Sequence, residues 1–370
     1  MEKKRVLYLG GFELPDKNAA AHRVMSIAKL LRDLGYEVGF IGPVKDRNDV
    51  APEVDGFRCE YVDYPKGTAQ WLDYITTFVS PSMIDSFRPD YVILYNFPAV
   101  ASLKVVGYCH KRGIKVIHDI TEWETPRGWS FRELIRRFDI NLRMKYCMRK
   151  MDGVIAISRY LYDRYKNETK CIMIPPVVDL EDKKWNRDRV LSAGGGVRLV
   201  YAGTAGFGNK DKLDIIVNAV QDFPSVSLTV IGMTAEQYEN GYGPMPDSCD
   251  NVRFLGRVPH HEAVSAVCDA DFQMLIREDT LKTRAGFPTK FVESFSSCTP
   301  VIATLTSNIG DYLVDGVNGY VVDDMETLKS VIGKASAASA DEIIRMKEAC
   351  RSCEAFDYRS YKGVLASLFE

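Results

Sequence analysis

The sequence predicts an α/β protein built from two doubly wound domains with parallel sheets. Short apolar runs rich in β-branched residues alternate with longer amphipathic segments along almost the whole chain. The alternation stops at a polar stretch after residue 179 and then begins again. The chain has 370 residues, which is more than one hydrophobic core usually serves, so two domains are the default expectation.

Candidate strands recur through the first half of the chain. A helix is predicted over Ala20–Leu34, because apolar residues such as Val24, Ile27 and Leu31 recur there at helical spacing. The strands predicted in this half are Arg5–Leu9, Glu37–Ile41, Tyr91–Tyr95, Lys115–Asp119, Gly153–Ile157 and Cys171–Ile174.

The same pattern restarts after a linker. The best linker candidate is the charged stretch Leu180–Arg189, which Gly194–Gly196 follows. The strands predicted beyond it are Arg198–Ala202, Ser227–Ile231, Val252–Leu255, Phe272–Ile276, Pro300–Ala303 and Tyr320–Val322. Because ligands of such sheets bind outside the carboxyl ends of the strands, we expect the site in the cleft between the two domains.

Bulk composition excludes several classes of protein. Lys and Arg number 48 and Asp and Glu number 50, a balance that argues against a nucleic-acid binder. The apolar run Val6–Leu9 is too short for a signal peptide, and no stretch reaches the roughly 18 apolar residues of a membrane span. We therefore expect a cytoplasmic protein, in which the nine scattered cysteines are reduced thiols. Gly10 and Gly11 lack the G-x-G-x-x-G spacing of a dinucleotide site, which disfavours a nicotinamide enzyme.

The stretch 286–303 carries the most informative chemistry. It consists of a loop, an amphipathic helix and a β-branched strand. The first turn of a helix presents unpaired N–H groups and a positive dipole end, which suit a phosphate. Thr289 can cap that end, Lys290 adds positive charge, and the carboxylate of Glu293, one turn further on, can hold a ribose diol. The alternative is an ordinary helix with a solvated glutamate.

This stretch resembles the nucleotide-sugar signature of glycosyltransferase family 4, in which two glutamates separated by seven residues precede a G-x-P-V-I-A-like strand. Glu293 matches the second glutamate, which binds the donor ribose in the family, and Ala285 replaces the first. Further fragments resemble the family in the same order, so the resemblance covers nearly the whole chain: Asp152–Ser158, Ile174–Asp179, Asn251–Val258 and Asp315–Tyr320. It implies a retaining, group 1 enzyme of the GT-B fold, with two facing Rossmann-like domains at 1–180 and 181–355. The last helix, within 356–370, is expected to return to the first domain.

The resemblance also implies donor contacts in the second domain. A glycine-dense loop begins at Gly203, where backbone can approach a ligand closely, and in the family an arginine and a lysine of this loop bind the diphosphate. Thr204 stands at the arginine position, and Lys210 can supply the lysine, with Lys212 as the alternative. We expect Arg277 to replace the missing arginine, the alternative being a solvated loop charge. The expected diphosphate set is Gly203, Thr204, Lys210, Arg277, Phe287, Pro288, Thr289, Lys290 and Glu293, with Arg257 and Val258 beside the base.

The acceptor side is expected in the first domain. His118 ends a predicted strand, where the family places a histidine that contacts the sugar, and the alternative is a structural histidine. The other acceptor-side candidates are Gly11, Asn18, Arg23, Asp119 and Glu122.

The resemblance implies transfer of a sugar, with retention, from a UDP- or GDP-sugar to a hydroxyl of a growing glycan or lipid-linked acceptor in polysaccharide or cell-surface glycan biosynthesis. His118, Lys210 and Glu293 are the expected catalytic residues. We expect no cofactor and no metal, because enzymes of this fold neutralise the leaving diphosphate with helix dipoles and basic side chains. Two other functions stay open. One is a nucleotide-sugar epimerase of the same fold, and the other is a catalytically silent nucleotide-sugar-binding subunit, which Ala285 and Thr204 would suit.

A basic and aromatic stretch at 127–150 indicates one more partner. Arg132, Arg136 and Arg137 are interleaved there with Trp129 and Phe131. Such residues on an amphipathic helix suit an anionic membrane surface, so we expect peripheral contact with the inner face of the membrane. The alternative is a crossover helix with a solvated basic face.

Overall fold

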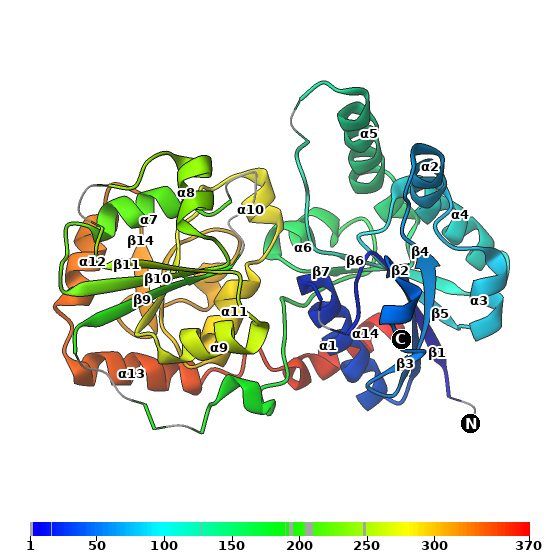
Figure 1. Cartoon of the computed structure of the whole chain (residues 1–370). Coiled ribbons are helices and arrows are strands. Elements are labelled where there is room, and N and C mark those ends of the chain that lie inside the picture. Colours follow the sequence, from blue (N-terminus) through cyan, green and yellow to red (C-terminus); the bar gives the residue numbers. More distant parts are fainter. Residues whose placement is uncertain are drawn as a thin grey trace. The chain divides into compact units, whose positions relative to one another are not determined.

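Parallel strands joined by helices make up both halves of the chain (Figure 1). The computed structural model describes residues 3–15, 17–126, 128–188, 190–191, 195–203, 210–246 and 249–370. The chain divides into two compact units. The first contains Met1–Val178, Ala285–Phe287 and Tyr358–Glu370, and the second contains Asp179–Arg284 and Pro288–Asp357. Each unit has its own sheet and its own hydrophobic core.

The sheet of the first unit has the strand order β3-β4-β2-β1-β5-β6-β7-β8. Its strands are β1 (Arg5–Gly10), β2 (Glu37–Val44), β3 (Glu53–Val54), β4 (Phe57–Asp63), β5 (Tyr91–Tyr95), β6 (Lys115–Ile120), β7 (Gly153–Ala156) and β8 (Cys171–Met173). All neighbouring strands run parallel except β3 and β4. Every residue of β5 and β7 is buried, as their continuous apolar runs predict for strands covered on both faces.

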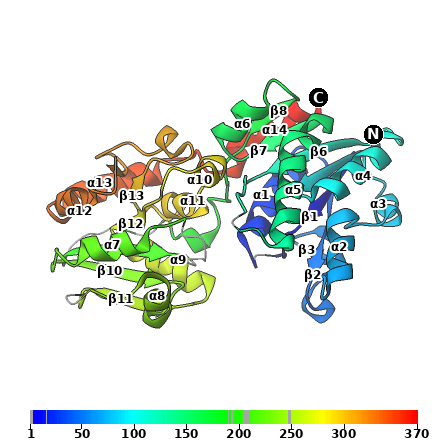
Figure 2. The ribbon, with the colours of Figure 1, turned by 90° about the horizontal axis from the view of Figure 1, so that it is seen from above.

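The helices of the first unit are α1 (Ala19–Asp33), α2 (Thr68–Thr76), α3 (Pro81–Phe87), α4 (Ala99–His110), α5 (Phe131–Lys145), α6 (Arg159–Tyr165) and α14 (Lys362–Phe369). α1 begins where Asn18 Oδ1 accepts a hydrogen bond from Ala21 N at 2.8 Å, which is a helix cap. The C-terminal helix α14 lies beside β8 (Figure 2). Tyr91 Oη donates to Phe369 O at 3.1 Å, so the chain end is tied to the core of the first unit.

One edge of this sheet differs from the prediction. β4 pairs in parallel with β2, and β3 folds back on β4, although the apolar runs indicate no strand in this region. The reason is that Arg58 and Glu60 interrupt the apolar residues of β4, and only Phe57 and Cys59 are buried. A strand next to the sheet edge with one polar face carries too weak an apolar pattern to be recognised.

The sheet of the second unit has the order β11-β10-β9-β12-β13-β14, and all pairs run parallel. Its strands are β9 (Val197–Ala202), β10 (Val226–Ile231), β11 (Val252–Gly256), β12 (Phe272–Leu275), β13 (Val301–Thr304) and β14 (Gly319–Val322). Its helices are α7 (Leu213–Val220), α8 (Ala235–Tyr242), α9 (His260–Asp269), α10 (Leu281–Ala285), α11 (Thr289–Ser296), α12 (Leu328–Ser336) and α13 (Ala340–Arg351), with the last residue of α10 assigned to the first unit.

Alternate residues of β9 pack on opposite faces of this sheet. Leu199 and Tyr201 join the core that α7 covers, whereas Val200 and Ala202 join the cluster that α9 covers. The two helices accordingly lie on opposite sides of the strands (Figure 1). Helices on both faces of a parallel sheet are the arrangement that the sequence predicts.

The predicted linker packs against the second unit. Trp185 is 2% exposed, and its indole Nε1 donates to Asp179 O at 2.9 Å. Arg187 Nη1 donates to Ser296 O at 3.2 Å. The described part of this segment is therefore held by side-chain contacts and does not behave as a free tether.

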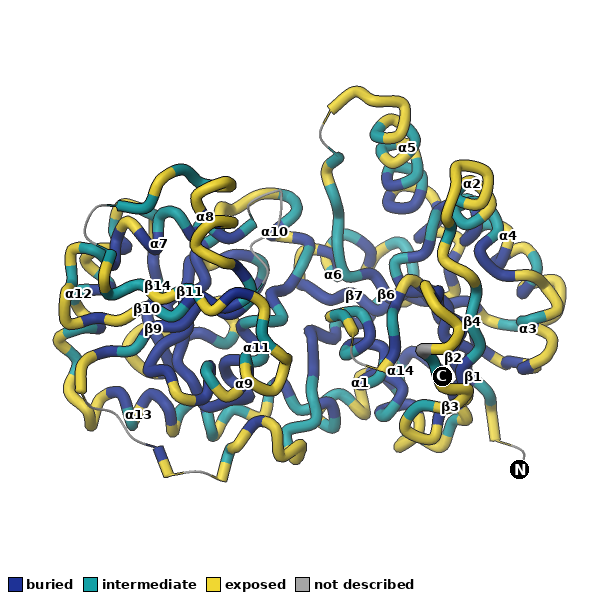
Figure 3. The backbone as a smooth tube through the Cα atoms, in the orientation of Figure 1, coloured by how far each residue is buried: buried dark blue, intermediate teal, exposed yellow. Residues whose placement is uncertain are grey.

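Burial follows the strands in both units. Figure 3 shows the strands as mainly buried segments, whereas exposed residues lie on loops and outer helix turns. No helix in the described ranges combines the length and the apolar character that crossing a bilayer requires.

Candidate active site

Charged side chains gather in the second unit where β9 and β12 end. Tyr201 lies near the carboxyl end of β9, and Arg277 follows β12. Asp211 lies just before α7, where it forms an isolated antiparallel bridge with Arg277. Lys290 comes from the first turn of α11. The carboxyl ends of parallel strands are where folds of this class bind their ligands.

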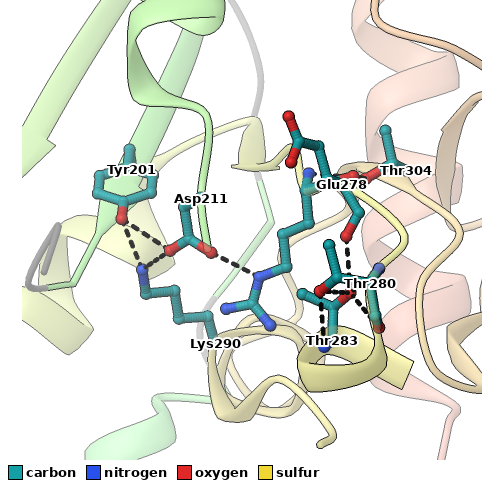
Figure 4. A network of polar contacts seen from close by, with 8 residues as sticks. Tyr201, Asp211, Glu278, Thr280, Thr283, Lys290 and Thr304 are labelled. Atoms are coloured by element: carbon teal, nitrogen blue, oxygen red, sulfur yellow. Dashed lines mark hydrogen bonds and ion pairs between the residues drawn. The ribbon is translucent and has the colours of Figure 1, made fainter. Parts of the chain in front are cut away.

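Asp211 is the centre of this cluster (Figure 4). Its Oδ1 accepts a hydrogen bond from Arg277 Nε at 2.5 Å, and its Oδ2 accepts one from Tyr201 Oη at 2.8 Å. Lys290 Nζ forms an ion pair with the same Oδ2 and donates to Tyr201 Oη at 2.8 Å. The Asp211 side chain is 7% exposed, so the protein rather than bulk water satisfies its oxygens.

Lys290 lies over the backbone of Gly203. A Cβ atom added at Gly203 would be 2.0 Å from Lys290 Cε, and the φ angle of this glycine is 148°. Lys290 Nζ also lies 4.2 Å from the centre of the Tyr201 ring, a cation–π distance. α11 begins at Thr289, and Pro288 before it makes no side-chain cap. Thr289 is thus the first helical residue and not the cap that the sequence indicates, and Lys290 lies in the first turn, at the positive end of the helix dipole.

The close packing of these charges shifts their pKa values. Burial alone would raise the pKa of Asp211, but the charges of Lys290 and Arg277 outweigh it and hold the pKa below its usual range. Burial lowers the pKa of Lys290, and the nearby carboxylate of Asp211 opposes this effect. Burial, reinforced by the charge of Asp211, raises the pKa of Tyr201. The cluster therefore contains one carboxylate, Asp211, and two cations, Arg277 and Lys290. This excess of positive charge suits an anionic ligand.

Arg277 connects this cluster to an open pocket. Its backbone N donates to Thr304 Oγ1 and its carbonyl accepts from the same hydroxyl, both at 2.8 Å, which fixes the end of β12 against β13. The pocket has a volume of about 330 Å³ and is lined by Arg277, Glu278, Asp279, Thr304, Leu305, Thr306, Val322, Asp323, Asp324 and Met325. Because its other charged lining residues are acidic, the pocket suits neutral hydroxyl groups better than phosphate.

Two lysines, Lys210 and Lys212, follow the glycine-dense loop. Lys212 Nζ forms an ion pair with Glu278 Oε1 at 2.5 Å. Lys210 is partly buried and adjoins Asp211, and Thr204 lies outside the described residues.

Sequence reasoning misses Asp211, because a lone acid between two lysines matches no motif. Its position beside a glycine-dense loop is the one signal that could have identified it.

The remaining donor candidates lie on neighbouring elements. Glu293 is partly exposed on α11, three residues beyond Lys290. Phe287 is buried, as is Pro288 directly before α11. Arg257 is exposed and Val258 is partly buried, directly after the carboxyl end of β11. Both therefore lie at the same edge of the sheet as the cluster.

Asp119 and Arg23 form a buried ion pair in the first unit. Asp119 is 0% exposed and Arg23 is 4% exposed, and Arg23 Nη2 donates to Asp119 Oδ1 at 2.7 Å. Tyr8 Oη donates to Asp119 Oδ2 at 2.5 Å. Arg23 Nη1 also donates to Ile174 O at 3.0 Å and Pro175 O at 3.2 Å. The structure thus places these two acceptor-side candidates in a network that ties α1 to β6 and to the segment after β8.

His118 is also buried. It is 0% exposed, and neither ring nitrogen has a hydrogen-bond partner among the described residues. Burial, assisted by the charge of Arg143, lowers the pKa of His118 to about 3, so the imidazole is neutral at physiological pH. Among the other candidates, Gly11 is exposed after β1, Asn18 caps α1, and Glu122 is partly exposed after β6.

Comparison with known protein families assigns both halves of the chain. Residues 20–182 match the sequence model described as Glycosyltransferase Family 4, and residues 196–337 match the one described as Glycosyl transferases group 1. A curated relative, the uncharacterized glycosyltransferase MJ1178 of Methanocaldococcus jannaschii, is 24% identical over 188 residues. That match covers 48% of this chain and 47% of the relative, so the chain spans about half the length of the curated relative it matches.

Solved structures share the fold over the whole chain. Sucrose-phosphate synthase from Thermosynechococcus elongatus has a TM-score of 0.73 at 13% identity, covering 99% of this chain and 98% of that chain. The Anabaena protein HepE, solved in complex with UDP and glucose, has a TM-score of 0.67 at 13% identity, covering 99% of each chain. At such identity the likeness shows the fold alone, and it confirms the predicted pair of parallel-sheet domains of the GT-B type.

Proposed function

Because this chain belongs to the group 1 glycosyltransferases and is similar to family 4, we propose that it transfers a sugar from a nucleotide diphosphate donor to a hydroxyl group. The observation that carries the proposal is the cluster of Lys290, Arg277 and Asp211 beside the first turn of α11. Its excess of positive charge and the positive dipole end of α11 suit a diphosphate, which gains negative charge as its bond to the sugar breaks.

The donor that we propose to test first is a UDP-sugar, with GDP-sugars second. A protein of the same fold, HepE, was solved with UDP and glucose, which supports a uridine nucleotide. Glu293 on α11 would accept hydrogen bonds from the ribose, and Arg257 and Val258 lie after β11, where a base would be held. We propose that the acceptor is a growing glycan or a lipid-linked sugar, within polysaccharide or cell-surface glycan synthesis.

We propose that transfer proceeds with retention of configuration. The bond between the anomeric carbon and the diphosphate oxygen breaks, and the acceptor oxygen adds to the same face of the sugar. The acceptor proton passes to the leaving phosphate, while Lys290, Arg277 and Lys210 balance its charge without a metal or other cofactor. His118 is the candidate that orients the transferred sugar, because its ring nitrogens lack partners among the described residues. Its complete burial requires a side-chain movement before that contact forms.

A donor screen tests the proposal. The purified protein is incubated with UDP-, GDP- and ADP-sugars, and thermal stabilisation and slow release of nucleotide are measured for each. A ligand at about 100 times its Kd should stabilise the folded state by about 2.7 kcal/mol. Glu293→Ala should weaken both signals for the preferred donor, whereas Glu239→Ala, at an exposed position on α8, should change neither.

Each other outcome of this screen has a defined meaning. Stabilisation without turnover, even when acceptors are present, would favour a catalytically silent nucleotide-sugar-binding subunit. Isomerisation of the donor sugar without any acceptor would favour an epimerase. No response to any nucleotide sugar would contradict the proposal.

We also propose that α5 contacts an anionic membrane surface. Phe131 and Phe138 are 79% and 63% exposed and lie seven residues apart, on one face of the helix. Trp129, just before the helix, is 81% exposed, and the guanidinium of Arg137 lies 4.9 Å from the centre of its ring. Exposed aromatic residues beside arginines suit the boundary between headgroups and acyl chains.

Sedimentation with lipid vesicles tests this contact. The wild-type protein should sediment with vesicles that contain phosphatidylglycerol, and less so at high salt. The double variant Phe131→Ser, Phe138→Ser should lose this binding. Val317→Ser removes a side chain that is 51% exposed in the second unit and should leave binding unchanged. Equal sedimentation of all three proteins would contradict the contact.

A further inference from the structure

Asp211 is a buried carboxylate in a region that must attract an anion. A negative charge beside a diphosphate site opposes binding of the diphosphate. The presence of a carboxylate there therefore needs a separate explanation. We propose that Asp211 is a positioning residue, which holds Lys290 and Arg277 in place for the diphosphate of the donor. This inference rests on the proposed function and assigns Asp211 a specific role within the cluster that carries it.

The geometry ties three separate elements to this one side chain. Its two oxygens bind Arg277, which follows β12, Tyr201 on β9, and Lys290 on α11. Without the carboxylate, the two cations would repel each other, and the hydroxyl of Tyr201 would be the remaining hydrogen-bond partner of Lys290 Nζ among the described residues. Asp211 thus keeps the ammonium group over Gly203, where backbone can approach a ligand.

The charge of Lys290 also depends on Asp211. Among the described residues, the charged and titratable groups that act on its ammonium group are Asp211, Tyr201, Arg277 and Glu293. Burial and Arg277 both favour the neutral amine, and Asp211 is the carboxylate that opposes them by direct contact. Replacing Asp211 by asparagine therefore lowers the pKa of Lys290 further. A lysine is charged below its pKa, so the cation, and with it anion binding, would be lost as the pH rises.

A second carboxylate of the same unit provides a matched control. Asp271 is 0% exposed, pairs with Arg198 at 3.0 Å and with Lys347 at 3.2 Å, and lies directly before β12. It therefore resembles Asp211 in burial and in its two cationic partners, but it lies at the amino end of the strand. If Asp211 merely stabilised the fold, Asp271→Asn would reproduce the effects of Asp211→Asn.

The experiment measures binding of inorganic pyrophosphate, a probe that needs no knowledge of the base or sugar. Calorimetric titrations on the full chain compare wild type, Asp211→Asn, Asp271→Asn and Asp211→Glu between about pH 7 and pH 9. Dividing each variant's Kd by the wild-type Kd at the same pH removes the titration of the probe itself. For Asp211→Asn this ratio should rise by about tenfold for each pH unit above the lowered pKa of Lys290.

For the other variants, the ratio of the variant Kd to the wild-type Kd should not change with pH. Asp211→Glu retains the charge and should restore the wild-type pH profile, and it supplies the test if Asp211→Asn does not fold. The double variant Asp211→Asn, Lys290→Met should bind weakly at every pH, because the titrating group is gone. A flat ratio for Asp211→Asn, or the same rise for Asp271→Asn or Asp211→Glu, would overturn the assignment alone. A wild-type protein that binds neither pyrophosphate nor any nucleotide sugar would overturn the proposed function and this assignment with it.

Discussion

Replacing Asp119 by asparagine should strongly destabilise the first unit. The carboxylate is the counterion of Arg23, whose side chain is 3% exposed, and it accepts a hydrogen bond from Tyr8. Leaving a buried charge without its partner costs about 3–5 kcal/mol. Arg23 would keep its hydrogen bonds to the carbonyl oxygens of Ile174 and Pro175, so we expect the lower part of this range, about 3–4 kcal/mol.

Thermal unfolding measures this loss. For a unit of this size, each kcal/mol shifts the midpoint by about 2–4 °C, so the midpoint of the first unit should fall by about 6–16 °C. Asp63→Asn is the control, because Asp63 pairs with Arg47 on the exposed surface of the same unit, and it should barely move the midpoint. A wild-type midpoint for Asp119→Asn, combined with loss of sugar transfer, would refute the structural interpretation. It would instead place Asp119 at the acceptor, as the sequence predicts.

Two further variants probe His118 and Gly203. The pKa of His118 is about 3 in the folded chain and about 6.5 in the unfolded chain. Between these two pH values the imidazole of His118 is protonated in the unfolded chain and neutral in the folded chain. Stability should therefore fall by about 1.4 kcal/mol per pH unit below pH 6.5. His118→Asn should remove this part of the slope in urea unfolding, whereas exposed His261→Asn should keep it. Gly203→Ala should displace Lys290 and weaken pyrophosphate binding by about tenfold or more in calorimetry, because its Cβ would overlap Lys290 Cε. Gly316→Ala, which shares a positive φ but has open space around it, should bind pyrophosphate normally.

The sequence predicts the buried part of the fold better than its edge. Tyr91–Tyr95 is a strand with the predicted bounds, because a strand covered on both faces must be apolar throughout. β4, by contrast, carries Arg58 and Glu60 and is recognised only through its pairing with β2. β4 lies next to the edge strand β3, and its residues from Glu60 to Asp63 are partly buried or exposed, so they obey a weaker apolar constraint.

In the candidate site, too, the sequence predicts some residues and misses others. Lys290 and Glu293 are found because they belong to a helix-opening motif whose chemistry is local in sequence. Asp211 and Arg277 are brought together from positions 66 residues apart, and neither position carries a local signal of that pairing. For the same reason, the burial of Arg23 with Asp119, 96 residues apart, could not be foreseen from the residues themselves.

The position of Lys290 also bears on whether the site can function without the arginine and glutamate that the family carries elsewhere. Lys290 and Glu293 are three residues apart on α11, which puts them on neighbouring turns of one helix face. One rigid helix can therefore present a cation to the diphosphate and a carboxylate to the adjacent ribose, together with its own N–H groups. Ala285 and Thr204 remove two family contacts but leave this set intact. If Lys290 holds the diphosphate of the donor, Lys290→Met should abolish donor stabilisation and turnover together. Loss of turnover with full donor stabilisation would show that the diphosphate is held by other groups.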